Sequence, residues 1–349
     1  MPKIPTEAIG SVPRPKSLID AMAGPPEALG PEMEKALRET VTRLEATGSP
    51  IITDGEQSKP SFATYPLHGL DNLAEDGVVI PFEDGHTRQL PRLTAGPFRY
   101  ATYAGSYTAK AKTLTDLPVK QAVISASAMS LLYPETPIDG YSREQFLADL
   151  VDEAEKDIRS ALDAGAERVQ IDFTEGRLSI KLDPSRGLLK QFVALNNQVL
   201  DRFSEAERAR IGIHTCAGGD RNSTHSADVP YNELLPDLFE TKVTSFYVEM
   251  AGEEDPEPSL ALLGRLVGEG QRVFVGVIDP ISSEVEAPEL VRDRVLAAAQ
   301  HIPVERLGTT DDCGFSPFAD DVAMAREISF AKIEARIKGT KLAEEALED

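Results

Sequence analysis

Short runs rich in β-branched residues alternate along this chain with helical stretches of a dozen or more residues. Such a rhythm predicts βα units and a parallel sheet. Eight runs have this character, at residues 6–12, 49–56, 118–125, 167–174, 210–216, 243–250, 271–279 and 305–313. Eight βα units that close on themselves form a TIM (β/α)8 barrel, and the 349 residues exceed the roughly 250 that such a barrel needs. We therefore expect an α/β fold in which residues 1–349 form a single (β/α)8 barrel domain. An open doubly wound sheet is the alternative, but no G-x-G-x-x-G motif follows the first strand.

Several segments between the strands have their own expected structure. Helices are predicted at 144–165, 188–204, 286–301 and 319–347, with Ser142 in the position of an N-cap. Residues 77–113 alternate apolar and polar side chains around an Asp84-Gly85 hairpin signal, which predicts an antiparallel insertion after the second βα unit. Loops are expected at 22–31, 174–187 and 215–225, the last two over the mouth of the barrel.

The overall charge limits the partners of this protein. A net charge of -22 repels nucleic acid and anionic membranes, so neither is expected as a partner. No run approaches the ~20 apolar residues that span a bilayer, and the start of the chain lacks the apolar region of a signal peptide. We expect a soluble, cytoplasmic protein. Its two cysteines could form a disulfide, be buried thiols or bind a metal, and a disulfide is least expected in a reducing compartment.

Chemically active side chains gather at the carboxyl ends of the predicted strands, where barrels of this kind place their active sites. They are Ser11, Asp54, Glu56, Asp172, His214, Cys216, Glu249, Asp279, Asp311, Asp312 and Cys313. His214 and Cys216 are two positions apart on one strand, so their side chains share a face. With Cys313 and Glu249 they offer one nitrogen, two sulfurs and one oxygen, a set that suits Zn²⁺. The alternative is that both cysteines are small buried apolar residues and His214 is only hydrogen-bonded.

These strand ends, in this order, resemble the catalytic barrel of cobalamin-independent methionine synthase and its single-barrel relatives. The motifs that carry the resemblance are IGSVPRP near the start, DGE at 54–56, QID at 170–172, HTC at 214–216, VE at 248–249, GVID at 276–279 and DDCG at 311–314. The resemblance implies that His214, Cys216, Cys313 and Glu249 hold a zinc ion that binds the acceptor thiol. Of the four, Glu249 matches the family pattern least well, because its spacing from Cys216 is long for the family. Glu240 is a weaker candidate for the same ligand position.

The resemblance also implies a site for the thiol substrate homocysteine. Its amino and carboxyl groups would be held by Ser11, Glu56 and Asp172, with backbone groups of Ile9 and Gly10. Two carboxylates directed at one ammonium group form a charge-assisted clamp. The alternative is that Glu56 and Asp172 only cap the helices that follow them.

The methyl-donor half of the family pattern is missing. The chain has no tryptophan, and Ser125 and Ala126 stand near the position where family members stack the pterin of folate. Pro280 and Ile281 follow Asp279, where the family has a proton-donating histidine. We therefore expect a methyl donor other than methyltetrahydrofolate polyglutamate, with methylcobalamin, free or on a corrinoid protein, as the favoured candidate.

Two further residues, His225 and Asp279, are assigned to catalysis. His225 could replace the absent proton donor, although a lone loop histidine is more often a surface residue. Asp279, with Asp312, could orient the metal ligands through hydrogen bonds.

Two other functions stay open from the sequence. The first joins a coenzyme M-like thiol to an epoxide or another electrophile on the same zinc site. Its sulfonate would need a cation, for which Arg14, Lys16, Arg177 and Lys181 are candidates. The second is a non-catalytic metal-binding barrel, because a fold does not fix a function.

Overall fold

A parallel sheet of six strands forms the centre of the protein, whose computed structural model describes residues 3–348. The strand order is β12-β11-β10-β7-β6-β5, and every pair is parallel. The strands are β5 (Lys120–Ile124), β6 (Arg168–Asp172), β7 (Ile211–Thr215), β10 (Ser245–Val248), β11 (Arg272–Ile278) and β12 (Leu307–Asp311). The expected α/β fold with a parallel sheet is confirmed, and these six strands lie within six of the eight predicted runs.

The two most N-terminal extended segments lie along the two edges of this sheet. Thr6 forms a parallel bridge with Thr309 of β12, and Ile52 forms one with Val119, which directly precedes β5. The amide of Val12 donates to the carbonyl of Gly55 at 3.1 Å, so the two segments also contact each other. These contacts join the edges of the six-stranded sheet into a ring.

The predicted strands at 6–12 and 49–56 are therefore single bridges in the structure and not regular strands. The second segment leaves the extended conformation early, because Gly55 and Glu56 both have positive φ angles, of 61° and 56°. A left-handed backbone ends strand pairing at that point. The strand prediction was wrong in regularity but right in the location of both segments.

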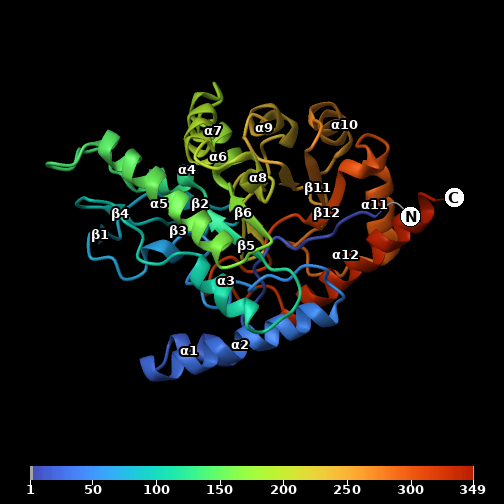
Figure 1. Ribbon diagram of the computed structural model, residues 1–349, viewed down its shortest axis with the longest axis horizontal. Coiled ribbons are helices and arrows are strands. Elements are labelled where there is room, and N and C mark those ends of the chain that lie inside the picture. The colour runs from blue at the N-terminus through green and yellow to red at the C-terminus, as the bar shows by residue number, and fades with distance from the viewer. Residues whose placement is uncertain (1–2, 349) are drawn as a thin grey trace.

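The helices lie outside the sheet, with α7, α9, α10 and α11 along one side of it in Figure 1. They are α1 (Lys16–Met22), α2 (Pro26–Ala46), α3 (Gly105–Lys112), α4 (Ala126–Met129), α5 (Arg143–Asp163), α6 (Glu175–Leu182), α7 (Gly187–Leu200), α8 (Glu205–Arg208), α9 (Tyr231–Leu238), α10 (Glu257–Leu266), α11 (Pro288–Ala299) and α12 (Arg326–Ala346), with short 3-10 turns η1 (Tyr65–Leu67), η2 (Ser130–Leu132) and η3 (Val304–Arg306). The four predicted helices correspond to α5, α7, α11 and α12.

Helix α5 shows how the sequence specifies these elements. Ser142 accepts a hydrogen bond from the Gln145 amide, and the Gln145 side chain bonds back to Ser142, which completes a capping box. One face of the helix buries Phe146, Leu150 and Ile158 in the apolar core between helices and sheet. The predicted N-cap is confirmed.

Two predicted loops contain helices. Helix α2 begins at Pro26, inside the expected loop 22–31, because proline is well suited to the first turn of a helix, where its missing N–H costs nothing. Helix α6 occupies residues 175–182 of the expected loop 174–187 and buries most of its side chains. The Pro, Gly and Ala content of residues 22–31 therefore led to a wrong prediction, and the loop prediction for 174–187 was wrong over residues 175–182.

A small antiparallel region precedes α3. Strand β2 (Val79–Pro81) pairs with β3 (Thr87–Gln89) across a turn in which Gly85 has φ 90°. Strand β1 (Leu73–Ala74) pairs with β4 (Arg92–Leu93). Helix α3 occupies the last part of the range 77–113, so antiparallel pairing does not extend through it. Within residues 3–348, no helix is both long and apolar enough to cross a membrane.

Candidate metal centre and the adjoining pocket

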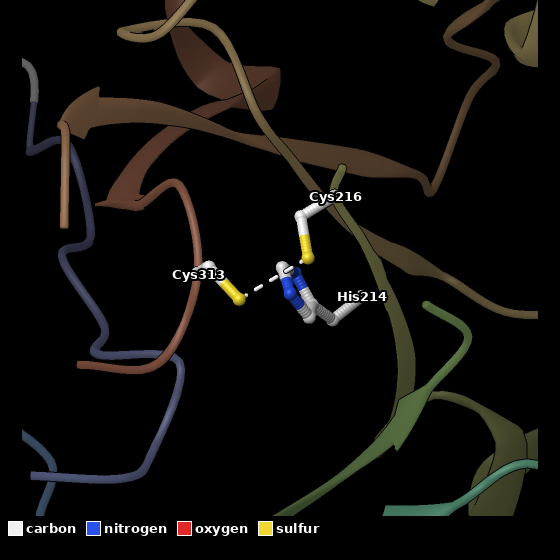
Figure 2. A group of neighbouring side chains, drawn as sticks. All are labelled: His214, Cys216 and Cys313. Carbon is white, nitrogen blue, oxygen red and sulfur yellow. Dashed lines mark hydrogen bonds between the residues drawn. The ribbon is translucent and has the colours of Figure 1, made fainter. Parts of the chain in front are cut away.

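Three potential metal ligands meet at the carboxyl end of the sheet. His214 lies in β7, Cys216 follows that strand, and Cys313 follows β12. One ligand atom from each of these residues lies within 4.8 Å of the others, and all three side chains are buried. Figure 2 shows both sulfur atoms directed toward each other, with the imidazole ring beside them. The structure therefore brings together three of the four predicted ligands.

The imidazole of His214 has one nitrogen in a hydrogen bond and one without. Its Nδ1 lies 3.3 Å from the carbonyl oxygen of Tyr247, whose strand β10 is paired with β7 at this position. Its Nε2 is buried and has no hydrogen-bond partner among the described residues. Metal-bound histidines commonly donate one N–H to a carbonyl and coordinate through the other nitrogen. Nε2 is therefore the ligand atom that this geometry makes available.

The two sulfur atoms fit a zinc ion without a large rearrangement. The Sγ atoms of Cys216 and Cys313 lie 3.2 Å apart. Two thiolates on a tetrahedral zinc, each at about 2.3 Å, stand about 3.8 Å apart, so a shift of about half an ångström accommodates the ion. The hydrogen bond from Cys216 holds the pKa of the Cys313 thiol well below its usual range. One nitrogen and two sulfurs are a donor set that zinc accepts.

Glu249, the predicted fourth ligand, lies outside this group of three. It lines a cavity together with Cys216 and Cys313. Its carboxylate accepts a hydrogen bond from the amide of Ala217 and stands 3.5 Å from a guanidinium nitrogen of Arg177. Burial raises the pKa of Glu249 to about 7, and the charge of Arg177 opposes that rise. Its carboxylate is thus near the sulfurs but engaged elsewhere.

Asp312 and Asp279 organise backbone around the same cavity, which they also line. The Asp312 carboxylate accepts hydrogen bonds from the amides of Met250, Ala251 and Gly252, at 2.9, 2.9 and 2.6 Å. Asp279 accepts one from the amide of Ile281 at 2.8 Å. Asp312 therefore holds the loop at residues 250–252 in place, and Asp279 holds the turn that immediately follows it.

A second depression, here called the central pocket, adjoins the metal group. Its lining consists of Ile9, Gly10, Ser11, Glu56, Phe62, Ile80, Phe82, Arg88, Asp172, Thr174, His214, Gly218, Gly219, His225, Cys313, Gly314, Pro317 and Phe318. All five residues predicted to bind substrate are in that lining, as are His214, Cys313 and His225. This arrangement agrees with the expectation that the ends of the predicted strands meet at one end of the sheet.

The polar side of the central pocket holds two buried carboxylates. Burial raises the pKa of Glu56 to about 7, while Lys59 opposes this effect. Burial also raises the pKa of Asp172, against the effect of His214. Asp172 accepts a hydrogen bond from the Gln170 side chain at 2.7 Å, and Glu56 accepts one from Lys59 at 3.0 Å. Two desolvated acids in one pocket form a site that a cationic group would stabilise.

Ser11 lies where three segments meet. Its hydroxyl oxygen accepts a hydrogen bond from the amide of Ser316 at 3.2 Å. A Cβ at Gly314 would stand 2.1 Å from that oxygen, so only glycine allows this approach. The segment after Cys313 is therefore packed closely against the one that carries Ser11.

The roof of the pocket comes from the β2–β3 hairpin, which contributes Ile80, Phe82 and Arg88. Arg88 bonds both carboxylate oxygens of the fully buried Asp220, in the short strand β8 (Gly219–Asp220) that follows β7 and pairs with β9 (Ser223–Thr224). It also bonds Asp320, and its guanidinium lies 4.0 Å from the ring centre of Phe318. Sequence reasoning missed Arg88, although the expected hairpin was the available signal.

His225 forms part of the pocket wall and is buried, so the surface alternative does not describe it. Its Nδ1 lies 2.9 Å from the Ser226 hydroxyl, and its ring packs edge-on against Phe82. Burial lowers the pKa of His225 to about 4, assisted by the charges of Lys181 and Arg177. The imidazole is therefore neutral at pH 7.

The cations considered for a sulfonate are engaged in other contacts. Arg14 donates to the backbone carbonyls of four residues, and Arg177 donates to Glu253 and two carbonyls. Lys16 pairs with Asp20 of its own helix, and Lys181 pairs with Asp228. The described lining of the central pocket includes none of these four cations.

Glu175, a buried acid at the start of α6 that was not expected from the sequence, lies beside the residues that follow β5. The hydroxyls of Ser125 and Ser127 both donate to Oε1 of Glu175, and Oε2 is buried with no partner among the described residues. Burial raises the pKa of Glu175 to about 7. The position expected to lack pterin stacking is thus filled by an internal hydrogen-bond cluster. Nothing in the local sequence marks Glu175, because Ser125 is 50 positions away.

Comparison with known proteins identifies the class to which this fold and site belong. Residues 5–326 match the family described as "Cobalamin-independent synthase, Catalytic domain". The chain belongs to this family and is therefore a methyltransferase of the methionine synthase type.

Individual relatives match over nearly their whole length. The chain is 22% identical to a methionine synthase of Saccharolobus solfataricus, over 99% of this chain and 97% of that protein. A solved B12-independent methionine synthase from Shewanella sp. W3-18-1, in complex with selenomethionine, superposes with a TM-score of 0.78 at 19% identity, covering 99% of both chains. A putative vitamin-B12 independent methionine synthase from Listeria monocytogenes gives 0.70 at 19% identity, covering 97% of this chain and 98% of that one. At these identities the structural likeness establishes the fold alone.

Proposed function

We propose that this chain transfers a methyl group to the sulfur of homocysteine, in a zinc-dependent reaction that yields methionine. The observation that carries the proposal is the convergence of an imidazole nitrogen and two sulfurs beside a pocket with two buried carboxylates. We also propose that residues 1–349 form one (β/α)8 barrel domain with an insertion at about 77–113, which the family match over residues 5–326 supports.

His214, Cys216 and Cys313 would hold the zinc, with Glu249 as a proposed fourth ligand. Zinc, when bound, lowers the pKa of a coordinated thiol and so presents a thiolate at neutral pH. Asp312 and Asp279 keep the surrounding loops in place.

The protein's own groups bind and orient the amino acid. In the proposal, the carboxylates of Glu56 and Asp172 bind the ammonium group, and Ser11 with the backbone of Ile9 and Gly10 binds the carboxylate. Ile80 and Phe82 of the roof limit the access of water to the thiolate, which strengthens the electrostatic interactions inside. His225, neutral at pH 7, can donate a hydrogen bond from its imidazole but does not serve as a cationic acid.

The proposed methyl donor is methylcobalamin, free or on a corrinoid protein, and not methyltetrahydrofolate polyglutamate. The absence of tryptophan and the engagement of Ser125 and Ser127 with Glu175 support a site without pterin stacking. In this transfer the sulfur–carbon bond forms and the cobalt–carbon bond breaks, with its electron pair left on cobalt as cob(I)alamin. The thiol proton is released to solvent.

An anaerobic assay of zinc-loaded protein tests both parts of this proposal. Homocysteine is supplied with methylcobalamin, methyltetrahydrofolate or its polyglutamate, and methionine is quantified, with Cys313→Ser as the inactive control. We expect methionine with methylcobalamin only. Methionine from the folates alone would overturn the donor, and no methionine from any donor would overturn the proposed function.

A further inference from the structure

Lys59 is a fully buried cation directly behind the central pocket. It follows Glu56 by three residues, and its Nζ donates to Oε1 of Glu56 at 3.0 Å. The same nitrogen donates to the carbonyl oxygen of Ala122 in β5 at 2.9 Å. Lys59 therefore ties the turn that carries Glu56 to the adjacent strand.

Two aromatic rings complete the surroundings of this ammonium group. The Nζ of Lys59 lies 4.5 Å from the ring centre of Tyr65 and 5.7 Å from that of Tyr107. Ring faces stabilise a desolvated cation, and hydrogen bonds satisfy the remaining donors. Arg14 holds the backbone of the same turn, since it donates to the carbonyls of Glu56 and Lys59 at 2.7 and 2.9 Å. The ammonium group is thus fixed in position.

The positive charge of Lys59 lies beside a group of acids that comprises Glu56, Asp54 and Asp172. The ionisable groups that act on the Glu56 carboxylate are Lys59, Asp54, Asp172, Arg14 and Tyr107. Neighbouring carboxylates disfavour each other's ionised form, and burial disfavours it further. Lys59 is the cation that bonds this carboxylate directly. When both Glu56 and Asp172 are ionised, the charge of Lys59 balances one of them and leaves about one negative charge for a ligand to balance.

We infer that Lys59 is a positioning residue that favours the ionised form of the Glu56 carboxylate at the pocket wall and so selects thiols that carry an ammonium group. This inference rests on the proposed function and assigns to it a determinant of acceptor class. Lys59 acts through Glu56, since Lys59 itself does not line the central pocket, whereas Glu56 does.

The test compares two acceptors that differ only in the amine. Homocysteine and 4-mercaptobutanoate share the thiol, the chain length and the carboxylate. In Lys59→Met, we expect the KM for homocysteine to rise about 10- to 100-fold, the range for a lost hydrogen bond to a charged group. We expect the kcat and the kinetics with 4-mercaptobutanoate to change much less. Lys59→Arg, which retains the cation, should restore the preference for homocysteine.

The pH profile separates this role from simple support of the fold. In Lys59→Met, Glu56 should take up a proton at a higher pH than in the native protein, so homocysteine binding should be lost at a higher pH. Lys332→Met is the matched control, since Lys332 is equally buried and bonds Glu286 and the Asp279 carbonyl, none of which lines the central pocket. Lys332→Met should lower the free energy of unfolding without changing the ratio of the KM values for homocysteine and 4-mercaptobutanoate.

Folding and binding readouts keep the outcomes distinguishable. If Lys59→Met does not fold by circular dichroism, Lys59→Gln serves instead, because its amide can still donate to Ala122. Calorimetric binding of both thiols to zinc-loaded protein gives a readout that requires no methyl donor. If native protein binds neither thiol, the proposed function fails. If it binds homocysteine, and the Lys59 variants weaken both thiols equally or neither, the inference about Lys59 is wrong.

Discussion

The sulfur atoms of Cys216 and Cys313 lie 3.2 Å apart, although 97 positions separate the two residues in the sequence. The cysteines come from loops that follow β7 and β12, two strands separated in the sheet by β10 and β11. A buried pair of thiols lies beside an imidazole nitrogen that has no hydrogen-bond partner within residues 3–348, and a soft cation would complete this group.

Replacing either cysteine should remove the metal. We expect Cys216→Ser and Cys313→Ser to lose bound zinc and at least about 100-fold in activity, because even residues that only orient metal ligands cost 10–100-fold. Metal analysis after dialysis against a weak chelator measures the loss. Asp20→Asn, which alters an exposed ion pair far from this site in the chain, should retain zinc. Full zinc retention in both serine variants would exclude this site.

Cobalt substitution should report an open coordination position. We expect the thiolate-to-cobalt absorption of the cobalt protein to change when homocysteine is added, because a further sulfur joins the ion. A spectrum that stays the same at saturating thiol would indicate a closed structural site. The same titration with methionine is the control, since a thioether is a much weaker ligand than a thiolate.

The sequence was sufficient for the parts of the protein that depend on local pattern. β-branched runs predicted the six strands of the sheet, and the position of Ser142 predicted the start of α5. The rule that strand ends meet at one face selected residues that do line the central pocket, such as Glu56, Asp172 and His214.

The remainder depends on contacts between distant segments. Arg88 and Asp220 are 132 positions apart, and they meet only because the β2–β3 hairpin packs against β8. Lys59 gains its role from Tyr65, Tyr107 and β5 as well as from its neighbour Glu56. No periodicity or spacing records such contacts, so a one-dimensional pattern could not identify them.

Gly218 has no room for a side chain. It has a φ of 74°, and a Cβ there would stand 1.8 Å from Nε2 of His225. We expect Gly218→Ala to lower the free energy of unfolding by about 1–3 kcal/mol and to displace His225 from the pocket wall. Gly140→Ala is the matched control: Gly140 is exposed, has a similar φ of 72°, and has nothing within 4 Å of an added Cβ. That substitution carries the backbone strain alone and should cost only about 1 kcal/mol. Chemical denaturation measures both changes.

The ion pair of Arg88 with Asp220 should stabilise the roof of the pocket. In Arg88→Met, the buried Asp220 loses its bidentate partner but keeps His86, whose Nε2 lies 3.0 Å away, so we expect a destabilisation of about 2–3 kcal/mol. Proteolysis within the β2–β3 hairpin should accelerate. Arg92→Met, which breaks an exposed pair with Asp76 in the same region, should cost less than about 1 kcal/mol. If the two substitutions lowered the free energy of unfolding equally, Arg88 would not stabilise the roof in this way.

The buried carboxyl of Glu175 should make stability depend on pH. Its folded-state pKa is raised from 4.5 to about 7, so the native state binds a proton more tightly than the unfolded chain does. The stabilising contribution is fully present below about pH 4.5 and is lost as the pH rises to about 7. Glu175→Gln keeps an oxygen for the two serine hydroxyls and carries no charge, so it should remove about 2–3 kcal/mol of the decline in unfolding free energy over this interval. Denaturation at pH 5 and pH 8 measures the difference, and Glu27→Gln, at an exposed position, should leave the decline unchanged. A decline in Glu175→Gln as steep as in the native protein would show that the carboxyl of Glu175 is ionised throughout.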